Sequence, residues 1–129
     1  TRPLDPSRSI DVCLIERRHR VMIVVEIWNR LDDLGSAARA TSRKVAEAAD
    51  LAAGPLGGGT VASRWLLVDT AANRALVRRL PAVLRSRCPG SSLGWVRALA
   101  DGATPPREPG IAWIDPRAGR ISELRLAGV

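Results

Sequence analysis

Two runs near the start of the chain are largely apolar. Residues 9–16 and 20–28 are rich in Val and Ile, and the polar stretch Arg17-Arg18-His19-Arg20 joins them. β-Branched runs of this length favour strands, and a short polar connection favours an antiparallel hairpin. Both faces of residues 20–28 are apolar, so we expect that segment to be a central strand.

A helical pattern follows from about Asp32 to Ala52, where Gly54-Pro55 would end it. The inward stripe consists of small and apolar residues: Leu34, Ala38, Thr41, Val45 and Ala48. Charged residues lie on the opposite side: Arg39, Arg43, Glu47 and Asp50. Residues 64–70 predict a third strand, which a right-handed crossover would make parallel to the second.

The second half of the chain alternates between helices and strands. Residues 72–87 predict a helix that Pro81 kinks or divides, and 92–100 a short further helix. Residues 110–114 and 120–126 predict a hairpin with its turn at 115–119. We therefore expect one domain over residues 1–129, with a core at about 9–102. Its fold class would be α/β, with a mixed central sheet flanked by helices and a C-terminal β-hairpin at 110–126.

The charge of the chain favours an anionic partner. The net charge is +7 at pH 7, and all but one of the 20 basic residues are arginine. Nucleic acid, DNA foremost, is the expected partner, although a GC-rich coding sequence would also enrich arginine. Arginines on the predicted helices are candidates for binding phosphates, the alternative being a solvated face: Arg39, Arg43, Arg74, Arg78 and Arg79.

Other features of the sequence indicate the cellular compartment of the protein. Two scattered cysteines, Cys13 and Cys88, form no disulfide framework, which favours a reducing compartment and a cytoplasmic location. No apolar run is long enough to span a bilayer, and the start does not resemble a signal peptide. The first residue is not Met, so we expect a piece of a longer protein. A homodimer is left open.

The hairpin carries the candidate chemistry. If its turn centres on residues 18–19, Asp11 lies directly opposite Glu26, and opposed residues share one face of a sheet. Two carboxylates on largely apolar strands need compensation, which Mg²⁺ or Mn²⁺ supplies well. A register slip of one residue would separate the two acids, and pairing with arginine is a further alternative.

Lys44 is the only lysine in the chain. Its compact ammonium differs chemically from the planar guanidinium that the sequence uses elsewhere. We expect it on the flank of the first helix, about 80° from the centre of the inward stripe. From there it would assist the attacking water in metal-dependent cleavage of a phosphodiester. The alternative is one lysine on a solvated face.

These residues resemble the restriction-endonuclease-like, or PD-(D/E)xK, phosphodiesterase superfamily over residues 9–90. Its core runs helix, three-stranded meander, helix, strand, and the resemblance implies that Asp11 and Glu26 bind metal and that Lys44 takes part in catalysis. Ile10 replaces the proline of the motif and Trp28 its lysine, so Lys44 on the following helix takes that role. The segment 26–34, with Arg39, Lys44 and Asn73-Arg74, is also similar to an uncharacterised C-terminal domain of bacterial helix-turn-helix regulators.

The leading hypothesis is thus a nucleic-acid-associated domain with a magnesium-dependent, nuclease-like site formed by Asp11, Glu26 and Lys44. The main alternative is a non-catalytic sensing or dimerisation module of a DNA-binding transcription regulator, and a weaker one is an antitoxin-like or structural partner protein. His19 is the only histidine, which disfavours a histidine-based triad or a zinc site. The four tryptophans are expected in the core, with base stacking as the alternative.

Overall fold

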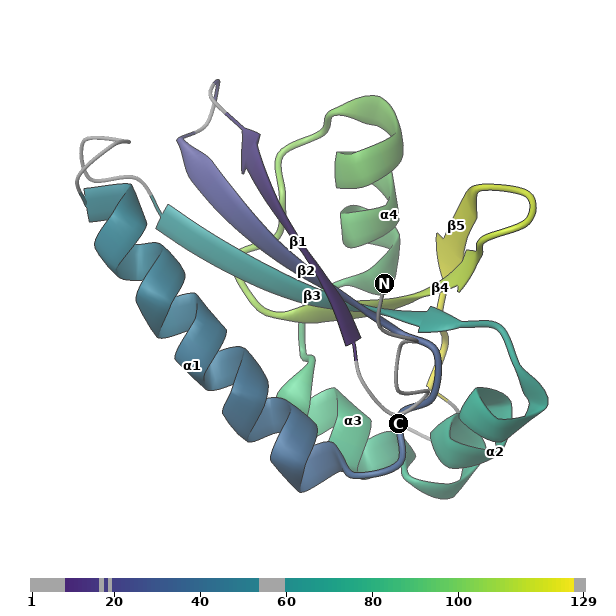
Figure 1. Ribbon diagram of the computed structural model, residues 1–129. Helices are drawn as coiled ribbons and strands as arrows, with labels where there is room; N and C mark the ends of the chain where they lie inside the picture. The colour runs from purple at the N-terminus through teal and green to yellow at the C-terminus, as the bar shows by residue number, and fades with distance from the viewer. Residues whose placement is uncertain (1–8, 17, 19, 54–59, 127–129) are drawn as a thin grey trace, which may run out of the picture.

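The computed structural model of the chain describes residues 9–16, 18, 20–53 and 60–126; for 9–11, 16 and 51–53 it describes the backbone alone. This part of the chain contains five strands and four helices, whose arrangement is shown in Figure 1. The first half contains β1 (Ser9–Glu16), β2 (Val21–Trp28), α1 (Leu34–Ala53) and β3 (Thr60–Val68). The second half contains α2 (Ala71–Arg79), α3 (Pro81–Arg87), α4 (Ser92–Asp101), β4 (Gly110–Asp115) and β5 (Arg120–Glu123).

The strands form one mixed sheet in the order β1-β2-β3-β4-β5. β1 and β2 form the expected antiparallel hairpin, β2, β3 and β4 are parallel, and β5 returns antiparallel to β4. The long α1 connection therefore joins two parallel neighbours, as a strand–helix–strand crossover should. The α/β class, the mixed sheet and the C-terminal hairpin predicted from the sequence are confirmed, although the hairpin ends at Glu123 and not at residue 126.

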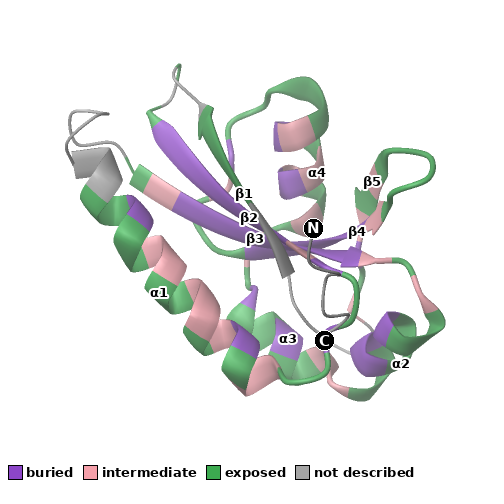
Figure 2. Cartoon of the chain, in the orientation of Figure 1, coloured by how far each residue is buried: buried purple, intermediate pink, exposed green. Residues whose placement is uncertain are grey.

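Helices cover both faces of the sheet. Figure 1 shows α1, α2 and α3 on one face and α4 on the other. A core cluster beneath the first group contains Trp28, Trp65 and Leu84, and a cluster beneath α4 contains Leu66 and Trp95. Figure 2 shows that β2 is buried along nearly its whole length, as expected for a central strand.

Several element boundaries differ from the sequence expectation. α1 begins at Leu34 because Asp33 caps it, its Oδ1 accepting a hydrogen bond from the Ser36 amide at 3.0 Å. β3 begins at Thr60, four residues before the expected start, and the loop residues 54–59 lie outside the described residues. Pro81 divides the expected helix into α2 and α3, where it stands in the first turn and needs no amide donor.

A buried asparagine fastens the β2–α1 connection to the end of β3. Asn73, fully buried at the start of α2, accepts a hydrogen bond from the Leu31 amide at 3.0 Å through Oδ1. Its Nδ2 donates to the carbonyl oxygens of Val68 at 2.9 Å and Asn29 at 3.1 Å. Since α1 starts directly after this connection, Asn73 helps to set the position of α1 over the sheet.

Candidate functional site

The strand register places the two acidic positions as predicted. Asp11 pairs with Glu26 between β1 and β2, so the two Cα atoms lie opposite each other at positions that share one face of the sheet. Residues 22 and 24, which alternate with Glu26 along β2, belong to the cluster that packs against Ala48 of α1. That face is therefore the one covered by α1. The side chain of Asp11 is outside the described residues.

The carboxylate of Glu26 is fully buried and hydrogen-bonded at both oxygens. Oε1 accepts from the Thr41 hydroxyl at 2.5 Å, and Oε2 accepts from the Lys44 ammonium at 3.0 Å. Removing a carboxylate from water is costly unless a counter-charge and hydrogen bonds replace the lost solvation. Thr41 and Lys44 supply both, because residues three apart lie on the same side of a helix.

Lys44 belongs to the sheet-facing side of α1, which corrects its expected flank position. The buried residues Ala37 and Ala48 bracket Thr41 and Lys44 at helical spacing. The Lys44 side chain is 30% exposed, so it lies between the fully buried Glu26 carboxylate and the solvent. Lys44 therefore contacts Glu26, and its expected role in catalysis stays a prediction.

Thr41 extends this network into the core. Its hydroxyl accepts a hydrogen bond from the indole Nε1 of Trp65 at 2.9 Å, and its own proton has two acceptors within reach, Glu26 Oε1 at 2.5 Å and the Ala37 carbonyl oxygen at 3.0 Å. The sequence placed Thr41 in the inward stripe and Trp65 in the core without giving either a polar role. The signal in the sequence that could have revealed the polar role of Thr41 is its place one helical turn before Lys44, the only lysine. Hydrogen bonds thus link Trp65 to Thr41, Thr41 to Glu26, and Glu26 to Lys44, and Asp11 is the position on β1 that pairs with Glu26.

The arrangement can hold a cation or orient a polar ligand beside the ammonium. Oxygen donors suit Mg²⁺ and Mn²⁺, and each carboxylate oxygen can accept more than one contact. In the described part of the chain there is no cluster of three or more His, Cys, Asp or Glu side chains that could hold a metal ion.

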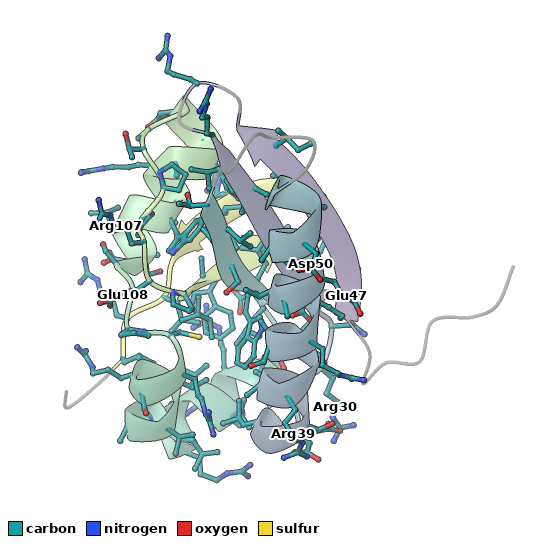
Figure 3. The ribbon with its side chains drawn as sticks, turned by 90° about the vertical axis from the view of Figure 1, so that its left-hand side faces the viewer. Arg30, Arg39, Glu47, Asp50, Arg107 and Glu108 are labelled. Atoms are coloured by element: carbon teal, nitrogen blue, oxygen red, sulfur yellow. The ribbon has the colours of Figure 1, made fainter. Side chains whose placement is uncertain are left out.

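The predicted phosphate-binding arginines separate into two groups. Arg39 and Arg43 are exposed on α1 and line a surface hollow of about 490 Å³ together with Arg87 of α3. Figure 3 shows Arg39 near the start of α1, and Glu47 and Asp50 nearer to its end. The hollow therefore lies near the start of α1, where arginines line it, and away from the acidic residues Glu47 and Asp50.

Arg74, Arg78 and Arg79 lie elsewhere, on α2. Arg74 binds both oxygens of Asp69, with Nε–Oδ1 and Nη2–Oδ2 distances of 2.5 and 2.8 Å, and its guanidinium lies 4.9 Å from the centroid of the Trp113 ring. This hydrogen-bonded pair lowers the pKa of Asp69 and raises that of Arg74. Arg78 and Arg79 are exposed in the last turn of α2.

One buried cation was not singled out from the sequence. Arg64 is only 1% exposed, and burial lowers the pKa of its guanidinium to about 10. The expected strand began at this residue, which suggested an accessible end rather than the middle of β3. The signal in the sequence was an arginine directly before the apolar run Trp65-Leu66-Leu67-Val68.

Comparisons with protein-family models, curated proteins and solved structures find no match to this chain. Among the helices that the structure describes, none has the length and apolar character needed to cross a membrane.

Proposed function

We propose that this chain is a nucleic-acid-associated domain of the restriction-endonuclease-like class, with a metal-assisted phosphodiesterase site at Asp11, Glu26 and Lys44. The observation that carries the proposal is the 3.0 Å contact between the only lysine and the Glu26 carboxylate, at the position on β2 that pairs with Asp11 of β1. Such hydrolysis uses acidic ligands for a metal ion and a cationic group beside them, and the paired acidic positions with Lys44 beside one of them support this reaction.

The topology supports the same class. An antiparallel hairpin, a crossover helix and a parallel strand follow one another in β1, β2, α1 and β3. The superfamily core described above has this succession after its first helix and strand. Agreement of topology supports a fold class, and the chemistry must be argued from the site.

In the proposed reaction, each residue has one task. A divalent cation held by Asp11 and Glu26 would polarise the scissile phosphodiester and lower the pKa of the attacking water. Lys44 would donate hydrogen bonds to the water or to the phosphate oxygens as negative charge develops. Thr41 would keep the Glu26 carboxylate in position, and Arg39, Arg43 and Arg87 would bind flanking phosphates.

Nicking of supercoiled plasmid in Mg²⁺ or Mn²⁺ tests this proposal. We expect activity in the wild type and its loss in Glu26→Gln and Lys44→Ala. Glu47→Gln, an equivalent change at an exposed position of α1, is the matched control and should retain activity. A wild type that does not nick, or a Glu26→Gln variant as active as the wild type, would contradict the catalytic proposal.

A non-catalytic sensing or dimerisation module of a DNA-binding regulator is the second candidate. The observation that favours it is the complete burial of Glu26, whose two oxygens are already satisfied by Thr41 and Lys44 as in a structural ion pair. β1 is an edge strand with Val12, Leu14 and Ile15 exposed, which suits a homodimer. This candidate predicts no nicking and a dimer in sedimentation that Leu14→Lys dissociates.

A further inference from the structure

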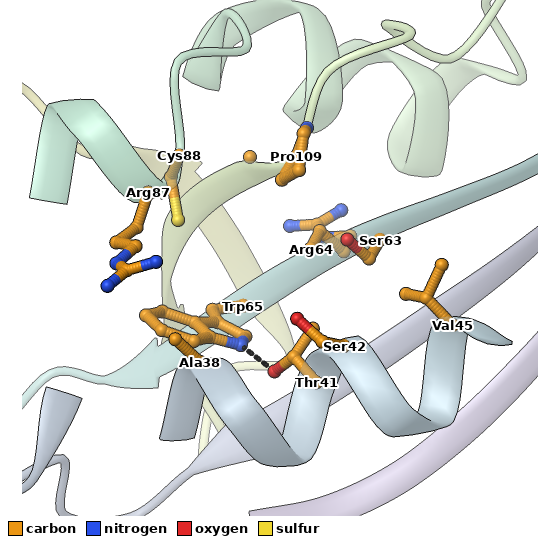
Figure 4. A pocket seen from close by; sticks show the side chains of 11 residues that line it. Ala38, Thr41, Ser42, Val45, Ser63, Arg64, Trp65, Arg87, Cys88 and Pro109 are labelled. Atoms are coloured by element: carbon orange, nitrogen blue, oxygen red, sulfur yellow. Dashed lines mark hydrogen bonds between the residues drawn. The ribbon is translucent and has the colours of Figure 1, made fainter. Parts of the chain in front are cut away.

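A pocket of about 330 Å³, called the inner pocket below, lies between α1 and the segments that face it, the end of α3 and the start of β4. Figure 4 shows α1 on one side of this pocket and Arg87, Cys88 and Pro109 across from it. Ser63 and Trp65, which alternate on the α1-facing side of β3, line it from the sheet. Pockets of this size hold small molecules in many proteins.

The inner pocket is separate from the candidate site at Glu26. Three residues of α1 line the pocket at the spacing of one side of a helix: Ala38, Ser42 and Val45. Lys44, which binds Glu26, does not line it. Thr41 borders both places, because it lines the pocket and donates to the Glu26 carboxylate. A ligand in the inner pocket would therefore lie beside the Glu26 network without replacing it.

The surface hollow of about 490 Å³ adjoins the inner pocket, because Ala38, Ser42 and Arg87 line both. Arg39 and Arg43 add two further guanidinium groups to the hollow. These three arginines are exposed, and no ion pair found among the described residues involves any of them. Guanidinium groups gathered around one hollow suit an anion that carries two charges and several acceptor oxygens, such as a phosphate monoester.

The inner pocket combines apolar side chains with hydroxyl groups. Val45, Trp65 and Pro109 are apolar, while the exposed Ser42 and the buried Ser63 bring hydroxyls from α1 and β3. A hydroxyl both donates and accepts hydrogen bonds. A hydrocarbon chain would leave the hydroxyls without partners, and a free sugar would bring polar groups against the apolar side chains. A flat heteroaromatic ring with polar atoms at its edge matches both kinds of lining.

The buried Arg64 does not supply the contact to the anion. It borders the inner pocket, but its guanidinium stacks on Trp95, on the face of the sheet that α4 covers. Its Nε and Nη2 are buried, so a ligand in the pocket does not reach them. The contact to the anion therefore falls to Arg87 and to the two arginines of α1.

We propose that this cleft binds a nucleoside monophosphate, with its phosphate in the surface hollow and its base in the inner pocket. Arg87 lines both parts and would bind the phosphate together with Arg39 and Arg43. The hydroxyls of Ser42 and Ser63 would pair with the polar edge of the base. The inference shares its arginines with the proposed function but needs neither a metal ion nor the acidic pair, so the two can fail separately.

Isothermal titration calorimetry of the whole chain at constant ionic strength tests this inference. AMP and UMP are compared with adenosine, which lacks the phosphate, and with ribose 5-phosphate, which lacks the base. We expect saturable binding of at least one of the two nucleotides. Adenosine and ribose 5-phosphate should each bind about tenfold more weakly or worse, because each loses one half of the contacts.

Variants at two exposed positions locate the site without disturbing the core. Arg87→Gln removes the guanidinium that lines both parts of the cleft, so nucleotide affinity should fall about tenfold. Ser42→Phe places a ring between the hollow and the inner pocket, so nucleotide binding should be lost while the Tm of the free protein stays unchanged. Arg120→Gln on β5 and Ser86→Phe on α3 are the matched controls, because both residues are exposed and line neither part.

Three outcomes would overturn the inference or its choice of ligand. The first is the absence of saturable binding of both AMP and UMP to the wild type. The second is equal nucleotide affinity in the wild type, Arg87→Gln and Ser42→Phe, because binding would then occur elsewhere on the chain. The third is ribose 5-phosphate binding as tightly as the nucleotides, which would overturn the choice of a nucleotide. Plasmid nicking enters none of these measurements.

Discussion

Replacement of Asn73 by alanine should remove more stability than any exposed substitution in this chain. The side chain makes three hydrogen bonds of 2.9–3.1 Å, to the Leu31 amide and to the Val68 and Asn29 carbonyls. Each contributes about 1 kcal/mol net, and the buried Leu31 amide left without a partner adds roughly 1 kcal/mol more. We therefore expect a loss of about 4 kcal/mol in the free energy of unfolding, out of the roughly 5–15 kcal/mol typical of a domain.

Urea unfolding followed by tryptophan fluorescence measures this loss. Asn29→Ala, an asparagine with an exposed side chain, is the matched control and should change stability by less than about 0.5 kcal/mol. Asn73→Asp should be worse than Asn73→Ala, because it removes both donors and turns a carboxylate toward backbone carbonyls. A loss below about 1.5 kcal/mol for Asn73→Ala, or an Asn73→Asp variant more stable than it, would refute this reasoning.

Three further predictions concern charges and thiols. Lys44→Met should destabilise the fold by about 3 kcal/mol because it leaves a buried carboxylate without its counter-charge, and adding Glu26→Gln should restore part of this in a double-mutant cycle of chemical unfolding. Ellman's reagent at pH 8 should modify the exposed Cys13 but not Cys88, because burial raises the pKa of the Cys88 thiol to about 12. In the unfolded chain Cys88 loses its proton at a lower pH, so this residue lowers the free energy of unfolding as the pH rises from about 9 toward 12. In urea, Ellman's reagent should titrate both thiols. If the surface hollow binds DNA, Arg39→Gln should reduce the slope of log K against log salt by about 0.9, and an unchanged slope would remove this residue from the interface.

Local sequence pattern was sufficient for most of the fold. The β1–β2 register followed from the turn length and from alternation along two strands, which fixes the face of every residue once the turn is placed. The division at Pro81 followed from the missing amide of proline. These features depend on near neighbours in the chain, which is why they could be predicted without a structure.

The features that the sequence did not reveal depend on contacts between distant residues. Trp65 donates to Thr41 across 24 positions, and Asn73 binds backbone groups more than 40 positions away. Arg64 was missed because the start of β3 was placed four residues late, which moved a mid-strand cation to a strand end. The contact of Lys44 with Glu26 depends on the angle of Lys44 on the helix, which the sequence analysis misjudged, and the role of Lys44 in catalysis stays a prediction.

The packing of Trp95 against β4 has a consequence for how far this sequence can vary. A Cβ atom added to Gly110 would lie 1.9 Å from Cδ1 of the Trp95 indole, closer than any real contact allows. Gly119, in the exposed β4–β5 turn, has open space around it and is constrained only by its positive φ of 62°. A saturation library should therefore accept asparagine at Gly119 and reject even alanine at Gly110. Because Gly110 has only a hydrogen there, the Trp95 indole can pack directly on β4, and the Arg64 guanidinium can stack on the indole, 5.5 Å from its ring centroid.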